Sequence, residues 1–531
     1  MRLPLAFRLT AASALVLALA WCCRAQAPPR DLAERLKIPP EVPGSEVPPI
    51  RLPRPEPANR KEREEAINKL YPPLPPLAPD VVPAPGPDGQ PLTLDQLQRI
   101  ALANNPIVRQ AEADVAAARG AAIQAGLYPN PNAGYEADQA GTANTAGLQG
   151  GFLEQTIVTA GKLTLARASA EIEVRNAELA LRRAQVDVFT QVRSAYFGVL
   201  VARENIKIAR AMARFTDEVY RIQVELVKSD QAAPYEPLQL RVLAMQQRGN
   251  LVQAHNRYVA AWKQLAAAIG LPGTPPTELA GCIDTNIPLY QYEQALARVL
   301  GTHTDVRTAE NNVAQARIDL RRAQVTPIPD VTVRGLLQRD HTTPPFPTVL
   351  SVQMTVPVPV WDRNQGNIQR AEALLFRAAQ QGQRARNDLT ARLAEAFARY
   401  DSSRTLLDYY RFSILPDQVQ SFRGTYQRHQ QDPLRVGFAD IIVAQQTLAS
   451  AVGIYVNTLG DFWSAVVDVA ALLQTDDVFQ LAQPECVLPV PDLERMTCPP
   501  LPPPLRADPV WPPAAPRPED LPMPRVNREP R

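Results

Sequence analysis

The residue types that most often carry out chemistry in proteins are few and scattered in this chain. None of its histidines belongs to an HExxH motif, and the sequence has no CxxC motif or glycine-rich phosphate loop. Single histidines far apart in sequence do not indicate a nucleophile with its base, or a metal with its ligands. The sequence therefore predicts a protein that is not an enzyme and that needs no cofactor or metal. The histidines are His255, His303, His341 and His429.

The first 25 residues have the pattern of a secretory signal peptide. A basic start precedes an apolar run that ends at Trp21, which is too short to span a membrane, and small residues surround Ala25. We predict cleavage after Ala25 and export of the chain. A lipid-modified Cys22 or Cys23 is the less favoured alternative, because the bulky Trp21 stands where that processing requires a small residue.

Proline is concentrated in two flanks and leaves the middle of the chain as the folded part. Of the 54 prolines, 19 lie in residues 28–91 and 16 in residues 484–530. We expect an extended N-terminal extension over 26–91, with one short helix from Pro57 to Leu70, and a proline-rich tail over 476–531. The formal net charge of +2 would become −1 on loss of the three leader arginines, which argues against nucleic acid as the main partner.

Cysteine usage is sparse once the leader is removed. Cys282, Cys486 and Cys498 remain, and three thiols do not make a disulfide framework. Cys486 and Cys498 are close enough in sequence to close a short loop in the tail, and comparing masses with and without reductant and alkylation tests that pairing.

One stretch, residues 163–228, dominates the middle of the chain. Its apolar residues recur every three or four positions, and Gly198 is its only glycine or proline. A helix of this length is on the order of 100 Å long, several times the width of a compact domain. We therefore expect a long rod that packs along its whole length as part of a coiled coil.

The same order of elements occurs twice, which indicates a two-fold internal repeat. VRQAEADVAAARGAAIQAG is matched by VRTAENNVAQARIDLRRAQ, and YPNPNAGYEADQ by TPIPDVTVRGLLQ. The first copy, 92–280, reads as a helix, a β-hairpin over 131–158, the long helix 163–228 and a return helix over 235–269. The second copy, 281–475, reads as a helix over 289–325, a hairpin over 329–357, a long helix over 364–429 and a return helix over 438–473. Pro106 should break the first helix, and Pro416 should interrupt only the second long helix.

The predicted strands have the length and pattern of membrane strands. The fourth alternates Leu350, Val352 and Met354 with polar residues, and after the leader no segment has the ~20 consecutive apolar residues of a spanning helix. Four strands cannot close a barrel, because single-wall barrels begin at about eight. Two chains would bring eight strands and three chains twelve. A small soluble sheet is the alternative, but helices this long leave no compact core for it to cover.

Five stretches in order resemble the TolC-type outer-membrane efflux family over residues 92–475. They are LTLDQLQRIALANNP, the YPNP before the first hairpin, VPVPVWDRNQGNIQRAEA, SILP, and DIIVAQQTLASAVGIYVNTLGDFWSAVVDVAALL. The resemblance implies a mainly α fold with a small β part. Long coiled-coil helices would form a trimeric α-barrel in the periplasm, and four strands per chain would contribute to a shared twelve-stranded transmembrane β-barrel in outer-membrane lipid.

The resemblance also implies partners and a function. Such a homotrimer is the exit duct of a tripartite efflux pump: it docks on a periplasmic adaptor and an inner-membrane pump and conducts substrates outward. The competing hypothesis is a periplasmic coiled-coil scaffold that never enters the membrane, and recovery in the soluble periplasmic extract without detergent would favour it. The transported substrate is not identified by the sequence.

In this family, the periplasmic tip lies where the two long helices of each repeat meet. Here that implies a candidate aperture, and Asp440 matches the first acid of a D-x-x-D-A-Q pattern while Val443 replaces the second. A ring of such carboxylates would attract cations and pair with Lys228 or Arg435, although solvated helix-end charges are an equally good interpretation. The candidate aperture residues are Lys228, Asp230, Glu236, Asp432, Arg435 and Asp440, and Val436, Gly437 and Phe438 resemble an adaptor contact.

Overall fold

The structure is a computed structural model of the 531-residue chain. It describes residues 42–43, 45–47, 50, 52–53, 60–79, 82–86, 89–229, 233–284, 287–431 and 438–485. The predicted leader over 1–25 and most of the tail over 476–531 lie outside these residues. So do several single-residue predictions: Cys22, Cys23, Asp230, Asp432, Arg435, Val436, Gly437, Cys486 and Cys498.

The chain divides into two units, which we describe separately. Unit 1 comprises Met1–Leu74 and Val219–Val242, and unit 2 comprises Pro75–Glu218 and Leu243–Arg531. Helix α6 (Lys162–Lys228) and helix α7 (Glu236–Ala268) each contribute residues to both units. Unit 2 therefore holds the strands and most of the helical part.

The first helical segment of unit 2 is broken where Pro106 predicts a break. Helix α4 (Leu94–Asn104) begins with a capping box between Thr93 and Gln96. Helix α5 (Pro106–Ala125) has the proline at its first position, where a missing N–H costs no hydrogen bond. The side chain of Asn105 caps α5 by accepting from the Ile107 N–H at 2.9 Å. Thus one residue ends α4 and starts α5.

A similar break occurs in the segment predicted to be the second copy, where VRTAENNV aligns with VRQAEADV. Helix α8 (Tyr292–Thr302) and helix α9 (Thr304–Val325) replace the single helix expected over 289–325. His303 separates them, and its Nδ1 accepts from the Asp305 N–H at 3.1 Å. His303 therefore takes the role that Asn105 has in the first copy.

The His303 cap should make stability depend on pH. Burial lowers the pKa of His303, with Asp305 opposing and Arg392 and Arg183 reinforcing the shift. Because its unfolded pKa is about 6.5, the unfolded chain binds the proton first, and stability should fall as pH drops below about 6.5. His303→Asn keeps a capping acceptor and should flatten this dependence. Denaturation midpoints at pH 7.5 and 5.5 test it; equal pH dependence in both proteins would show that His303 is not the sensor.

The two long rods predicted over 163–228 and 364–429 differ in continuity. Helix α6 runs uninterrupted, whereas the second rod consists of α10 (Gln365–Tyr409), a π-helix (Tyr410–Ile414) and α11 (Leu415–Gln431). Pro416 lacks an N–H, and its ring crowds the carbonyl four residues earlier, so the widened turn just before it relieves this conflict. The predicted interruption is confirmed, and α12 (Phe438–Leu473) then returns along the rod.

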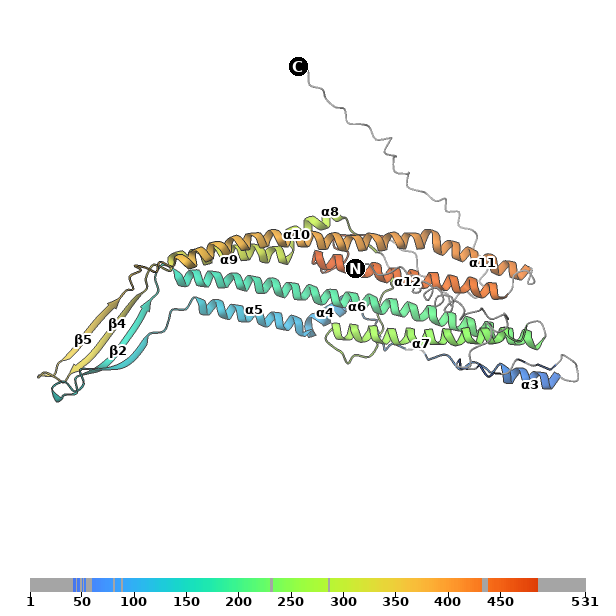
Figure 1. The fold of residues 1–531 in the computed structure, drawn as a ribbon, viewed down its shortest axis with the longest axis horizontal. Helices are drawn as coiled ribbons and strands as arrows, with labels where there is room; N and C mark the ends of the chain where they lie inside the picture. Colours follow the sequence, from blue (N-terminus) through green and yellow to red (C-terminus); the bar gives the residue numbers. More distant parts are fainter. Residues whose placement is uncertain are drawn as a thin grey trace, which may run out of the picture. The chain divides into compact units, whose positions relative to one another are not determined.

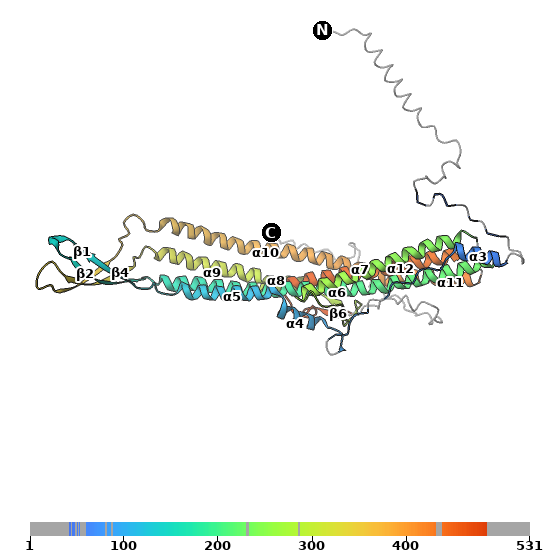
Figure 2. The same cartoon turned by 90° about the horizontal axis from the view of Figure 1, so that it is seen from below.

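Four strands form one antiparallel sheet at one end of the helices of unit 2 (Figure 1). They are β1 (Asn132–Asp138), β2 (Leu148–Ile157), β4 (Val331–Asp340) and β5 (Thr348–Thr355), in the order β1-β2-β4-β5. Figure 2 shows the same sheet turned by 90°. Strands β1 and β5 are its edges, so within one chain the sheet is open.

The best-packed part of unit 2 is an aromatic core between α6, α10 and α12. The rings of Phe197 and Trp463 stack at 4.1 Å, and the Trp463 indole donates to the Ile283 carbonyl at 2.9 Å. Tyr400 donates to the Pro288 carbonyl at 3.0 Å, inside the short strand β3 (Ile287–Leu289). Strand β6 (Gln483–Glu485) pairs with β3, so the start of the predicted tail is part of the fold.

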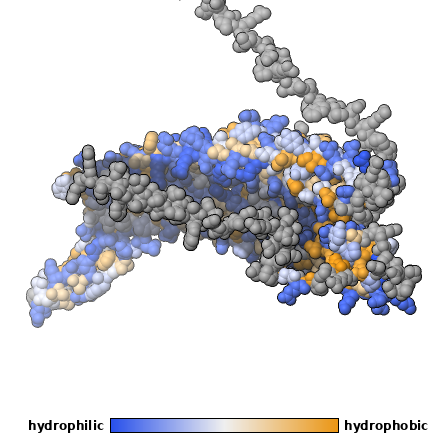
Figure 3. Space-filling model, turned by 45° about the vertical axis from the view of Figure 1, so that its right-hand side comes forward, coloured by the Kyte–Doolittle hydropathy of each residue, from blue (hydrophilic) through white to orange (hydrophobic). Residues whose placement is uncertain are grey.

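One helix among the described residues is long and apolar enough to span a membrane. It covers Asp440–Leu473 in α12, with a mean hydropathy of 1.3, but 67% of its apolar window is buried inside the protein. Burial against α10 and α6 is sufficient to explain that composition. The face in Figure 3 is mostly hydrophilic toward its left and centre, while hydrophobic residues gather toward its right-hand side.

The N-terminal extension is docked on the helices. In unit 2, both Nε and Nη2 of Arg248 donate to the Pro75 carbonyl, at 3.0 and 2.8 Å, while the same guanidinium pairs with Asp217. Further along, Ala84 and Leu92 form bridges with Thr277 and Leu279. The extension thus follows helices rather than running free, and its helix α3 (Arg60–Leu70) lies in unit 1.

Candidate functional site

The sheet has one exposed apolar face. Side chains alternate between the two faces of a strand, and the strand register places one apolar set together across all four strands. Leu350, Val352 and Met354 are about 70% exposed, and Leu337 is 56% exposed. We call this surface the apolar face. Its members include Tyr135, Leu153, Ile157, Val331, Val333, Leu337, Leu350, Val352 and Met354.

The opposite face of the sheet, here the polar face, is held by side-chain interactions. Arg334 forms an ion pair with Glu136, and its guanidinium lies 4.3 Å from the centre of the Phe152 ring. Gln338 donates to Asp138 at 3.0 Å. Its charged residues in the described strands are Glu136, Asp138, Glu154, Asp340 and Arg334, so carboxylates outnumber cations.

A polar clamp joins the sheet to the start of α6. The carboxylate of Asp330, just before β4, accepts from the Thr159 N–H and from Lys162 Nζ, both at 2.9 Å. The Thr159 hydroxyl also donates to the Pro329 carbonyl at 2.7 Å. The turn that leads into α6 is therefore fixed to the turn that leads into β4, which sets the position of the strands on the helices.

The first predicted tip lies in unit 1. Glu236 accepts a short hydrogen bond from Gln223, and Lys228 pairs with Glu225 at 2.8 Å. Lys228 thus has a partner within α6 itself, a residue one turn earlier that was not among the predicted tip carboxylates. Lys228 and Glu236 remain at the two ends of the turn, but each has its own partner.

The second predicted tip lies in unit 2, where α11 ends and α12 begins. Asp440 is exposed and lines a groove of about 630 Å³ together with Arg428 and neutral polar residues. Phe438 begins α12, and its side chain lies outside the described set. The groove brings a carboxylate and a guanidinium to one surface, which suits polar contacts rather than catalysis. Its neutral members are Ser421, Gly424, Thr425, Gln427 and Gln431.

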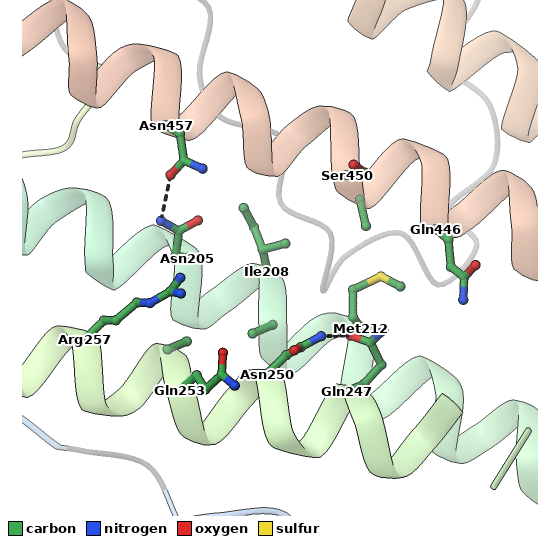
Figure 4. A pocket seen from close by; sticks show the side chains of 13 residues that line it. Asn205, Ile208, Met212, Gln247, Asn250, Gln253, Arg257, Gln446, Ser450 and Asn457 are labelled. Carbon is green, nitrogen blue, oxygen red and sulfur yellow. Dashed lines mark hydrogen bonds between the residues drawn. The ribbon is translucent and has the colours of Figure 1, made fainter. Parts of the chain in front are cut away.

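A second groove, of about 520 Å³, lies between α6, α7 and α12 (Figure 4). Asn205 donates to Asn457 at 3.2 Å, and Asn250 donates to Gln247 at 3.3 Å. Arg257 is the one charged side chain among the residues that line it. Neutral amides can hydrogen-bond to water or another polar surface but cannot act as acids or bases near neutral pH. The spacing of apolar residues along these helices predicted that they pack together here, but it did not predict this groove.

The histidines do not gather into a site. His255 and His303 are buried in different helical segments, and the described residues contain no cluster of three or more His, Cys, Asp or Glu side chains able to hold a metal ion. Cys282 is an exposed thiol. Among the described residues, the candidate functional features are therefore surfaces: the two faces of the sheet and the helix ends next to the two predicted tips.

The comparisons with known proteins agree with this geometry. Residues 97–271 match the outer membrane efflux protein family. The cobalt-zinc-cadmium resistance protein CzcC of Cupriavidus metallidurans is 25% identical over 385 residues, which cover 72% of this chain and 90% of CzcC.

Solved structures share the fold at low identity. CusC superposes with a TM-score of 0.60 at 16% identity, over 75% of this chain and 99% of CusC. The open state of the MtrE outer membrane channel of Neisseria gonorrhoeae gives a TM-score of 0.58 at 17% identity, over 72% of this chain and 88% of MtrE.

These matches indicate where the protein is located and what kind of activity it has. The chain is an outer-membrane protein whose large helical part lies in the periplasm, and its role is transport through a channel rather than catalysis. The family-model match over residues 97–271, the CzcC relative and the shared fold together make this chain similar to the TolC-type outer membrane efflux proteins.

Proposed function

We propose that this chain is the outer-membrane exit duct of a tripartite efflux pump, which passively conducts substrates from a periplasmic adaptor and an inner-membrane pump to the exterior. The exposed apolar face of the sheet, backed by a hydrogen-bonded polar face, carries the proposal. A soluble protein would cover such a face with helices, whereas a membrane strand turns it to lipid and its opposite face to water.

The open sheet supports assembly of several chains, and we propose a trimer. Strands β1 and β5 present unpaired edges, and β5 is exposed along its whole length. Backbone groups in lipid must all be paired, so these edges require neighbouring chains. Three chains would close a barrel of twelve strands, and homotrimers are the rule among channels of this family.

The helical part supports a two-fold repeat that builds the periplasmic tunnel. The breaks at Asn105 and His303 fall at matching places, and in each a side chain caps the helix that follows. The two rods, α6 and α10 with α11, would then be equivalent helices in the wall of the tunnel. We propose that the tips of these rods contact the adaptor, with Val436, Gly437 and Phe438 among the contact residues.

Fractionation and bilayer recording test the function together. The channel proposal requires recovery with the outer membrane, extraction only by detergent, and discrete conductance steps in a planar bilayer. Recovery of the folded chain in the soluble periplasmic extract would favour the scaffold alternative. A membrane-inserted trimer without conductance would be consistent with the outer-membrane location but would contradict the proposal that the protein is an exit duct.

Cation preference is an expected property of this duct. Carboxylates outnumber Arg334 on the polar face, and a wall of one sign raises the local concentration of the opposite ion. The similar protein CzcC is named for resistance to cobalt, zinc and cadmium. We propose that cations are among the substrates of this chain.

Two carboxylates of the polar face should set this preference. Glu154→Gln with Asp138→Asn should lower the cation-to-anion permeability ratio at least about twofold, because each change removes three charges from a trimeric wall. Reversal potentials across a salt gradient measure the ratio. Gln353→Asn, on the same face, is the matched control. A larger drop in the cation-to-anion permeability ratio for Asp440→Ala would instead assign selectivity to the periplasmic tip.

A further inference from the structure

Helix α3 of the N-terminal extension packs on the first helix tip within unit 1. Its Ile67 is 0% exposed and the following Tyr71 is 4% exposed, and both belong to a separate small core with Tyr220, Val224 and Val227 of α6. The opposite side of α3 is solvated, with Lys61 and Glu65 exposed. Leu238 and Leu240 from the start of α7 complete this core, so α3 contacts the residues on both sides of the turn.

Polar groups of the extension also bind the backbone of this tip. The buried Arg63 guanidinium donates to the Val227 carbonyl at 3.4 Å and to the Pro53 carbonyl at 2.9 Å. The Val227 carbonyl belongs to the last turn of α6, where carbonyls have no partner within the helix. Arg63 therefore caps the end of α6, and its positive charge suits the negative end of the helix dipole.

Two tyrosines join the extension to the other side of the turn. The Tyr71 hydroxyl donates to the Pro234 carbonyl, which lies just before α7, and the Tyr220 hydroxyl donates to the Pro72 carbonyl at 3.0 Å. Burial raises the pKa of both hydroxyls, so they stay protonated donors at neutral pH. Donors on one segment thus reach carbonyls both before and after the turn between α6 and α7.

We propose that α3 is a clamp that holds the end of α6 and the start of α7 together. Contacts to Val227 and Pro234 can be made together only while the end of α6 and the start of α7 keep their present spacing. Ile67 anchors the clamp through buried apolar area, and Arg63 and Tyr71 make it specific for that spacing. The clamp is a property of unit 1 and does not depend on whether the chain conducts.

Hydrogen–deuterium exchange of the purified full-length chain tests the clamp. Ile67→Ala should raise the exchange rate of amides in residues 219–229 and 233–242 at least about tenfold, because truncating a buried aliphatic side chain removes that much local stability. Tyr71→Phe keeps the ring and removes only the hydroxyl, and it should give about a fivefold rise. Lys61→Ala, on the solvated side of α3, should leave exchange unchanged.

The internal reference is exchange in the α12 region near Trp463, which belongs to unit 2 and should stay constant in every variant. Unchanged exchange rates in residues 219–229 and 233–242 of Ile67→Ala would overturn the clamp, because these helix ends would then be stable without the packing of α3. A rise in Ile67→Ala without one in Tyr71→Phe would remove the hydroxyl from the clamp and leave only apolar docking, which also contradicts the proposal. Conductance of the same variants is recorded separately, so loss of channel activity is not mistaken for loss of the clamp.

Discussion

Replacing Arg193 by methionine should lower the free energy of unfolding of the helical part by about 1–3 kcal/mol, the cost of leaving buried hydrogen-bond acceptors without a donor. Arg193 is 1% exposed and donates to the carbonyls of Thr475 and Asp476. With the Gln98 amide oriented to fit the network, its oxygen accepts from Nε at 2.9 Å. Burial lowers the pKa of Arg193, as expected where water cannot solvate the charge.

Loss of these hydrogen bonds should loosen the C-terminal segment, because Arg193 fixes the residues that lead from α12 to β6. Urea denaturation followed by tryptophan fluorescence measures it, since Trp463 lies in the neighbouring core. Arg175→Met is the matched control: the same change on the same helix, at an exposed position. Equal midpoints for the two variants would show that the buried network adds no net stability.

Replacing Val352 by arginine should prevent stable insertion in the outer membrane. Val352 is 70% exposed, pairs with Gly335 in mid-strand and lies on the apolar face. Arginine facing the middle of the bilayer costs about 2–4 kcal/mol per site, and a trimer would carry that cost three times. The expected result is loss of the trimer band on unheated gels and loss of the chain from the outer-membrane fraction.

The neighbouring residue provides the control. Gln353 is next in the same strand, and its side chain lies on the polar face opposite Arg334. Gln353→Arg should therefore assemble like the parent chain. Assembly of both variants would mean that the apolar face does not contact lipid, and failure of both would point to a strand intolerant of any arginine.

Much of the fold could be predicted from local sequence. Asn105 before Pro106 predicts a helix break, and Pro416 predicts an interruption in one rod only, because a missing N–H acts wherever it lies. The alternation of Leu350, Val352 and Met354 indicated one apolar face. The extension was expected to be extended, either mobile or docked along the folded core; which of the two holds depends on remote contacts such as that between Arg248 and Pro75.

The candidate site was less accessible to sequence reasoning. Lys228 and Glu236 were predicted as aperture residues, and their partners within the chain, Glu225 and Gln223, were not foreseen. The burial of Arg193 could not be predicted, because one arginine among many on a long helix is expected to be solvated. The pairing of Arg334 with Glu136 depends on strand register, which alternation in single strands does not fix.

The π-helix before Pro416 keeps the second rod in phase. Leu393, Tyr400 and Leu407 follow one another at seven residues and are buried, but the next buried position, Leu415, comes eight residues on and Phe422 seven after that. In an unbroken α-helix, that extra residue would rotate every later apolar position by about 100° away from its partner. The wide turn absorbs it, so two stretches of coiled coil separated by a single-residue insertion still present one continuous seam.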